Sequence, residues 1–301
     1  MTIFRIVLGV YIAIALAVTL MSCNSSNSRT AGQSDTVRTE NTEQNSPLNE
    51  THNTGRDGVE LTNFKRYFDE AGVHGTFLLY SPDRKIMECY NCERADSAYT
   101  PASTFKIFNS LVALETGVIQ SERDTIAWDR VVRNREGWDQ SQDIRAAFKY
   151  STVWFYQELA RRIGRDKMKH YIDAAGYGNR DISGPIDRFW LDGKMAITPR
   201  QQIDLLERLH NNDLPFSQRT MDIVKDIMIN ERTGDAVLRA KTGTAIRTTG
   251  ICWWVGYVEK GKDVWYFAIN LDMKDNIDAM MKIRKEIVRR ILADRGIFPQ
   301  T

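Results

Sequence analysis

Segments with the pattern of β-strands occur near residues 75–90 and again near 236–271, and the segments between them have the pattern of helices. Residues 75–80 and 85–90 flank the turn sequence Ser-Pro-Asp-Arg and predict a β-hairpin. Three more strands are predicted late in the chain, at 236–241, 251–258 and 264–271. The sequence therefore predicts an α+β fold, in which an antiparallel sheet is flanked by helices and a helical lobe is inserted between its strands.

The predicted helices follow from apolar spacing and from residues that favour helix ends. The segment 116–232 is mainly helical in pattern, and Thr198-Pro199 is typical of a helix start. A last amphipathic helix would bury Ile283, Ile287, Val288 and Ile291. The helices are predicted at 63–71, just after Pro101, at 152–163, at 201–210 and at 277–292. The middle helices would form the inserted lobe.

Ser103 and Lys106 stand three residues apart at the start of one predicted helix, just after Pro101. Residues at this spacing are neighbours on a helix, so the lysine amine can reach the serine hydroxyl. A desolvated, neutral lysine can take a proton from serine, and the first helical turn offers free N–H groups to an oxyanion. The pair is a candidate nucleophile and base, although a solvated surface pair is the ordinary alternative.

Other motifs accompany this pair. Lys241-Thr-Gly lies in a strand-like run, and Ser-x-x-Lys with a later Lys-Thr-Gly is the signature of the serine penicillin-recognising enzymes. With Pro-Ala-Ser-Thr-Phe-Lys at 101–106, the chain from about 59 to 297 resembles the class D serine β-lactamases, or oxacillinases. The remaining matching motifs are Ser151-Thr-Val153, Tyr177-Gly-Asn179, Phe189-Trp190-Leu-Asp-Gly and Trp253-Trp254-Val-Gly.

The resemblance implies the serine β-lactamase (penicillin-binding) fold and hydrolysis of β-lactam antibiotics, which confers resistance. Ser103 would form an acyl-enzyme that water then cleaves. Lys106 would carry CO₂ as a carbamate and act as general base in both steps, with no other cofactor. Val153 would line the carbamate pocket, and Trp190 would donate its indole N–H to the carbamate.

The resemblance also implies roles around the second serine and the Lys-Thr-Gly strand. Ser151 would relay a proton to the leaving nitrogen, and Lys241 would keep this relay protonated. The backbone N–H groups of Ser103 and Thr244 would hold the carbonyl oxygen, and Arg284 would bind the substrate carboxylate with its fork of donors. The substrate-binding set would be Thr242, Gly243, Thr244 and Arg284.

The N-terminal segment predicts export. Arg5 precedes the apolar run 6–21, which is short for a membrane span and typical of a signal peptide. Leu-Met-Ser-Cys23 resembles the bacterial lipobox, which implies removal of 1–22 and a lipid on Cys23; a plain signal or an uncleaved anchor is the alternative. Residues 23–58 are polar and predict a flexible tether. Residues 59–301 would be the catalytic domain, anchored on the periplasmic side of a bacterial membrane.

The net charge, the histidines and the cysteines indicate which ligands and cross-links to expect. A net charge of +2 does not favour nucleic acid. No metal site is expected, because no metal-ligand spacing occurs among His52, His74, His170 and His210. Cys89 and Cys92 could form a disulfide after export, and Cys252 is predicted to be a buried free thiol. The preferred β-lactams and the oligomeric state are not predicted.

Three other functions were weighed. A penicillin sensor has a similar domain that is acylated without turnover, but this chain shows none of a sensor's several membrane helices and keeps the apolar Val153. A D-alanyl-D-alanine transpeptidase uses the same serine and Lys-Thr-Gly, usually with additional domains. An inactive β-lactam-binding lipoprotein is disfavoured because every motif residue is present.

Overall fold

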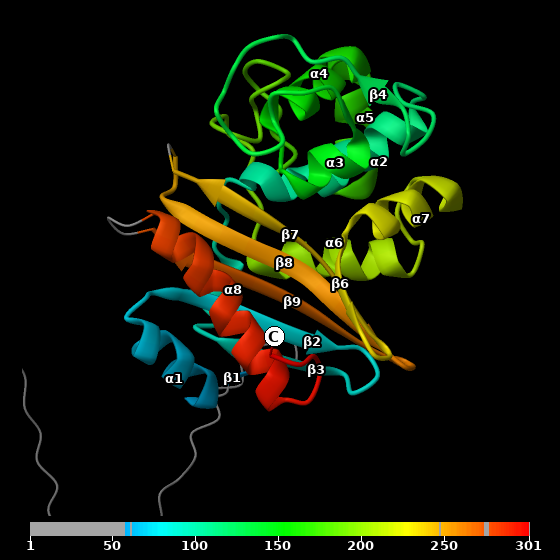
Figure 1. Ribbon diagram of the computed structural model, residues 1–301. Coiled ribbons are helices and arrows are strands. Elements are labelled where there is room, and N and C mark those ends of the chain that lie inside the picture. Colours follow the sequence, from blue (N-terminus) through cyan, green and yellow to red (C-terminus); the bar gives the residue numbers. More distant parts are fainter. Residues whose placement is uncertain (1–57, 61, 247, 274–276, 301) are drawn as a thin grey trace, which may run out of the picture. The chain divides into compact units, whose positions relative to one another are not determined.

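The central sheet of the computed structural model has seven strands in the described residues, which are 58–60, 62–246, 248–273 and 277–300 (Figure 1). The strand order is β1-β3-β2-β9-β8-β7-β6. All neighbours pair antiparallel except β1 and β3, which are parallel. The strands are β1 (Gly58–Glu60), β2 (Gly75–Ser81), β3 (Ile86–Tyr90), β6 (Ile229–Thr233), β7 (Ala236–Ala245), β8 (Ile251–Lys260) and β9 (Asp263–Asp272).

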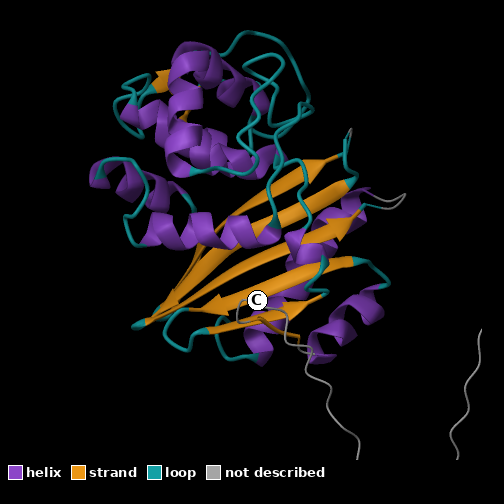
Figure 2. Cartoon of the chain, turned by 180° about the vertical axis from the view of Figure 1, so that it is seen from behind, coloured by secondary structure: helices purple, strands orange, loops and turns teal. Residues whose placement is uncertain are grey.

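Helices cover both faces of this sheet. Figures 1 and 2 show α1 and α8 on one face and α6 on the other, next to the lobe of remaining helices. The lobe also contains the two short strands β4 (Thr125–Ile126) and β5 (Gln142–Asp143). The helices are α1 (Thr62–Ala71), α2 (Lys106–Glu115), α3 (Ile144–Lys149), α4 (Val153–Ile163), α5 (Arg165–Ala175), α6 (Pro199–His210), α7 (Gln218–Ile227) and α8 (Ile277–Asp294). The predicted α+β fold with an inserted helical lobe is confirmed.

The sheet is buried on both faces, and β8 shows why. Its residues alternate sides, as in any strand. Trp253 and Val255 join the core that packs against the lobe, whereas Cys252 and Trp254 join the core beneath α1 and α8. Cys252 is a buried free thiol, as predicted.

Local signals placed several element ends correctly. The Thr198 hydroxyl accepts a hydrogen bond from the Gln201 backbone N–H at 3.1 Å, and the Thr198 N–H donates to Gln201 Oε1 at 3.0 Å. This capping box, with Pro199 in the first turn, fixes the start of α6. The predicted hairpin of β2 and β3 is also present.

Other features differ from the sequence predictions. β6 was not predicted, and β7 continues to Ala245, so the whole Lys-Thr-Gly-Thr motif is strand. Ser103 lies in a short 3₁₀ turn, Ala102–Phe105, rather than in the α-helix itself. The sequence left the pairing of Cys89 and Cys92 open, and in the structure a disulfide joins them.

The predictions for the N-terminal segment lie outside the described residues, except at residue 58. They are the signal peptide at 1–22, the lipid on Cys23 and the tether at 23–58, whose last residue, Gly58, is instead the first residue of β1. Within the described ranges, no helix is both long enough and apolar enough for a membrane span.

Candidate active site

The turn that carries Ser103 leads directly into α2, whose first residue is Lys106. Lys106 Nζ lies 2.6 Å from Ser103 Oγ, which is hydrogen-bonding distance. Ser103 is partly exposed, while Lys106 is fully buried. The predicted spacing therefore holds although the turn is 3₁₀, and the hydroxyl is accessible to a reactant.

Lys106 is fully buried, and an aromatic side chain lies beside its amine. Its Nζ lies 5.4 Å from the centre of the Tyr156 ring, and Tyr156 is hydrogen-bonded to Ser110 at 3.0 Å. Desolvation favours the uncharged amine, and it lowers the pKa of Lys106 from 10.5 to about 7. Near neutral pH a large fraction of Lys106 is therefore a free base beside the serine.

Trp190 packs against the same turn. Its ring stacks on Phe105 with centroids 5.3 Å apart, and its carbonyl accepts a hydrogen bond from the Ala102 N–H at 3.0 Å. The indole N–H of Trp190 is buried and has no hydrogen-bond partner among the described residues. Such a group is costly unless something accepts its hydrogen. Val153, the other predicted pocket residue, is the partly buried first residue of α4.

Ser151 and Lys241, the second serine and the second lysine of the motifs, are also in hydrogen-bond contact. Lys241 Nζ, from β7, lies 3.0 Å from Ser151 Oγ in the segment before α4. Burial lowers the pKa of Lys241 well below its usual value, and the nearby charges of Lys106, Arg284 and Lys285 lower it further. The lowered pKa of Lys241 makes proton exchange with Ser151 easier.

β7 lies directly against the nucleophile turn at Gly243. A Cβ atom there would come 2.9 Å from the Pro101 carbonyl oxygen and 3.0 Å from Thr104 Cγ2. Gly243 belongs to the predicted substrate-binding set, and its close packing on this turn is by itself sufficient reason for a glycine here. The Thr242 carbonyl accepts a hydrogen bond from Lys241 Nζ at 3.2 Å.

Arg284 reaches this end of β7 from α8. Its Nη1 donates to the Gly243 carbonyl at 2.7 Å and to Thr244 Oγ1 at 3.1 Å. The side chain is only 5% exposed, so a solvated surface ion pair, the ordinary alternative for this arginine, is excluded. The structure thus brings Ser103, Lys106, Ser151, Lys241, Gly243, Thr244 and Arg284 to one region, with Trp190 behind the turn.

Sequence reasoning missed Gln202. Its Nε2 donates to Thr104 Oγ1 at 2.9 Å, and Thr104 Oγ1 donates to the Pro101 carbonyl at 2.8 Å. Both side chains are buried, so this chain of bonds holds the turn around Ser103. A glutamine beside the apolar Ile203 in α6 was the available signal, but its partner could not be known.

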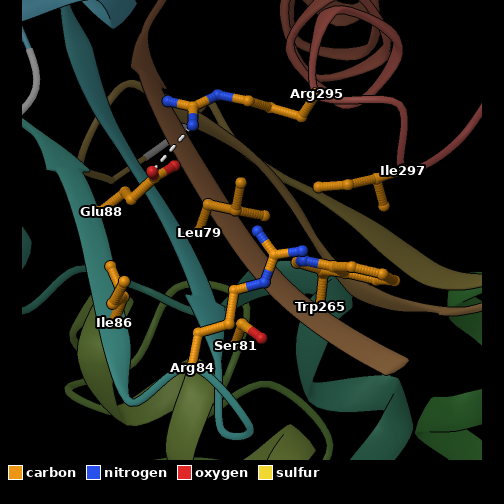
Figure 3. A pocket seen from close by; sticks show the side chains of 8 residues that line it. All are labelled: Leu79, Ser81, Arg84, Ile86, Glu88, Trp265, Arg295 and Ile297. Atoms are coloured by element: carbon orange, nitrogen blue, oxygen red, sulfur yellow. Dashed lines mark hydrogen bonds and ion pairs between the residues drawn. The ribbon is translucent and has the colours of Figure 1, made fainter. Parts of the chain in front are cut away.

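Figure 3 shows a pocket that is separate from this site. An Arg295–Glu88 ion pair of 2.9 Å crosses it, and the Arg84 guanidinium lies 5.9 Å from the Trp265 ring centre. None of the motif residues contributes to it. Its lining is Leu79, Ser81, Arg84, Ile86, Glu88, Trp265, Arg295 and Ile297.

Known proteins resemble most of the described part of the chain. The family model described as the penicillin-binding protein transpeptidase domain matches residues 62–293. The β-lactamase OXA-48 of Klebsiella pneumoniae is 41% identical over 241 residues, which are 80% of this chain and 90% of that protein. The crystal structure of the class D β-lactamase YbXI from Nostoc is 50% identical and has a TM-score of 0.76; the match covers 78% of this chain and 99% of that one.

A regulatory protein is also similar. BlaR1 of Bacillus licheniformis is 35% identical over 243 residues, which are 80% of this chain but 40% of that protein. The family model, the enzyme relatives and the solved structures agree with one another and with the motifs. The chain belongs to the penicillin-binding transpeptidase family and, within it, to the class D serine β-lactamases.

Proposed function

We propose that this chain hydrolyses β-lactam antibiotics through an acyl-enzyme on Ser103 and thereby confers resistance. The observation that carries the proposal is the 2.6 Å distance between Lys106 Nζ and Ser103 Oγ, with the amine fully buried. The resemblance to class D β-lactamases over about four fifths of the chain supports it.

In the first step Ser103 Oγ attacks the β-lactam carbonyl carbon while its proton passes to the base at position 106. The backbone N–H groups of Ser103 and Thr244 hold the oxygen that becomes negative, and such a donor typically lowers the barrier by about 3 kcal/mol. The C–N bond then breaks, and Ser151 gives its proton to the nitrogen. Ser151 recovers a proton through Lys241, whose Nζ lies 3.0 Å away. The proton that the base took from Ser103 returns along this route, so that the base is free again for the second step.

In the second step water hydrolyses the ester on Ser103, and this step also needs a base. We propose that Lys106 carries CO₂ as a carbamate, which would supply one acid–base oxygen group for both steps. Two observations support this: the amine of Lys106 has a pKa of about 7, and the buried Trp190 indole N–H has no partner among the described residues. Trp190 would donate to the carbamate, and Val153 would line its pocket.

The alternative is a β-lactam sensor that is acylated without turnover, and the similarity to BlaR1 favours it. The two functions differ only in whether the ester on Ser103 is hydrolysed. The apolar Val153 and the burial of Lys106 favour hydrolysis, because both favour the uncharged amine that can take up CO₂.

We also propose that the protein is exported, loses residues 1–22, and is held on the periplasmic side of a bacterial membrane by a lipid on Cys23. The support is the lipobox-like sequence Leu-Met-Ser-Cys and the polar residues 23–58 that follow it. Replacing Cys23→Ser should move the protein from the membrane fraction to the soluble fraction. An unchanged distribution would refute the lipid anchor.

One experiment separates the enzyme from the sensor. Each molecule of the purified protein should hydrolyse many molecules of a chromogenic cephalosporin, and the Ser103→Ala variant should be inactive. A single burst with a stable acyl-enzyme, seen by intact-protein mass spectrometry, would identify a sensor. Absence of any acylation would refute β-lactam chemistry altogether.

A further inference from the structure

The loop between β4 and β5, residues 127–141, packs against the segment that carries Ser151. The loop has no regular secondary structure, but it is held together internally. The Asp139 carboxylate accepts hydrogen bonds from the backbone N–H groups of Arg133 at 2.8 Å and of Asn134 at 3.0 Å. These hydrogen bonds give the loop a defined conformation, so it can hold the residues that it contacts in place.

Two tryptophan indoles connect this loop to both sides of Ser151. The indole N–H of Trp138 donates to the carbonyl of Tyr150 at 3.0 Å, directly before Ser151. The indole N–H of Trp154, in the first turn of α4, donates to the carbonyl of Trp138 at 2.9 Å. The loop is therefore bonded just before and just after the serine.

Gly137, in the same loop, packs against the ring of Tyr150. Its φ is +73°, and a Cβ atom at this position would lie 2.4 Å from carbon atoms of the Tyr150 ring. The Gln142 side chain in turn donates to the Gly137 carbonyl. The ring of Tyr150 thus lies against bare backbone, and its position is fixed by the loop.

Ser151 needs such support because its backbone is unfavourable. Its φ is +53°, in the left-handed region that L-residues other than glycine, asparagine and aspartate rarely adopt. A residue in this conformation persists only where its surroundings determine it. The conformation accompanies the 3.0 Å approach of Ser151 Oγ to Lys241 Nζ, and the proton relay depends on that approach.

We propose that Trp138 is a positioning residue for Ser151: the bonds Trp154–Trp138–Tyr150 hold Ser151 in its left-handed conformation and its hydroxyl on Lys241. This inference rests on the proposed function, because it concerns the proton that Ser151 gives to the β-lactam nitrogen. Trp138 acts through Ser151 and not through contact with the substrate.

The test is the rate of acylation, measured by quenched-flow mass spectrometry with a penicillin. Trp138→Phe keeps an aromatic ring but removes the donor to Tyr150, and it should slow acylation by about 10-fold to 100-fold, since small misplacements of reacting groups have effects of this size. Trp154→Phe should slow it in the same direction. The matched control is Trp128→Phe, because Trp128 Nε1 donates to the Val131 carbonyl at 3.2 Å in the same loop without reaching Ser151.

The same substitutions in a Ser151→Ala background show whether Trp138 acts by positioning Ser151, by contacting the substrate itself, or by supporting the fold in general. If Trp138 acts through Ser151, Trp138→Phe should change the remaining rate by less than about 2-fold there, because coupled residues are non-additive. An equal decrease in both backgrounds, or no decrease in the wild-type background, would overturn the proposal. Should Trp138→Phe fail to fold, Trp154→Phe gives the same comparison.

The outcomes also separate this inference from the proposed function. Wild-type protein that is not acylated refutes the proposed function. Wild-type protein that is acylated, with Trp138→Phe acylated at the same rate, refutes only the positioning role. A crystal structure of Trp138→Phe should show Ser151 Oγ moved away from Lys241 Nζ, and an unchanged position would contradict the inference independently of activity.

Discussion

Lys106 Nζ lies 2.6 Å from Ser103 Oγ, and no part of the Lys106 side chain is exposed. The contact joins a potential base, which is buried, to a potential nucleophile, which is partly exposed. The same burial that leaves the amine uncharged near neutral pH also makes the charged form costly to the fold. Activity and stability should therefore respond to pH in linked ways.

The rate of acylation should rise with pH through about 7 in CO₂-depleted buffer. The reason is that burial lowers the pKa of Lys106 to about 7, and only the uncharged amine can accept the Ser103 proton. The measurement is the acylation rate at a series of pH values around neutrality. A midpoint near the ordinary lysine value of 10.5 would contradict it.

Lys106→Met should abolish turnover and stabilise the fold. The decrease of the pKa of Lys106 from 10.5 to about 7 corresponds to roughly 5 kcal/mol of lost stability below pH 7. Between these two pKa values the unfolded chain binds more protons, so wild-type stability rises with pH and the gain from Lys106→Met shrinks. Urea unfolding in CO₂-free buffer measures this, with the exposed Lys282→Met as control. A gain that does not change with pH would refute the explanation.

Trp190→Phe should make turnover strongly dependent on added bicarbonate. The substitution removes a buried N–H that has no partner among the described residues and that would bind the carbamate. We expect a loss of about 10-fold or more at ambient CO₂, partly restored by bicarbonate. The control is Trp254→Phe, since that indole N–H is also buried and unpartnered in the described chain, but belongs to the core under α8. Equal responses of the two variants would argue against the carbamate.

Arg284→Lys should raise KM for substrates that carry a carboxylate. The guanidinium is 5% exposed and donates to Gly243 and Thr244, so its fork is held at the end of β7. A lysine cannot bind a carboxylate with two parallel bonds, and we expect kcat/KM to fall about 10-fold to 100-fold. The comparison is the methyl ester of the same penicillin. If the ester loses as much as the acid, Arg284 supports β7 and does not select the carboxylate.

The sequence was informative where signals are local. Thr198-Pro199 marks a helix start through its own hydrogen bonds, and the apolar spacing of 277–292 is that of α8. Candidate reactive groups could be named because motifs tie residue type to chemistry. Ser103 and Lys106 are close in sequence, so their contact could be predicted from helix geometry alone.

Features that depend on distant parts of the chain were not predicted. β6 (Ile229–Thr233) is polar and half-exposed, and its pairing with β7 is what makes it a strand. The support of Thr104 by Gln202 joins two helical segments that share no sequence signal. The link from Trp138 to Tyr150 is of the same kind, because the loop that carries it has no periodic pattern.

The tight packing of Gly243 on Pro101 has a consequence for when the protein becomes reactive. These two residues are far apart in the sequence, and the space between them has no room for even one methyl group. A nascent or half-assembled polypeptide therefore has its alcohol and its anion-holding amide in unrelated places. Such a chain would be chemically silent, and antibiotic could neither trap it nor be destroyed by it until β7 docks against the turn that carries Ser103.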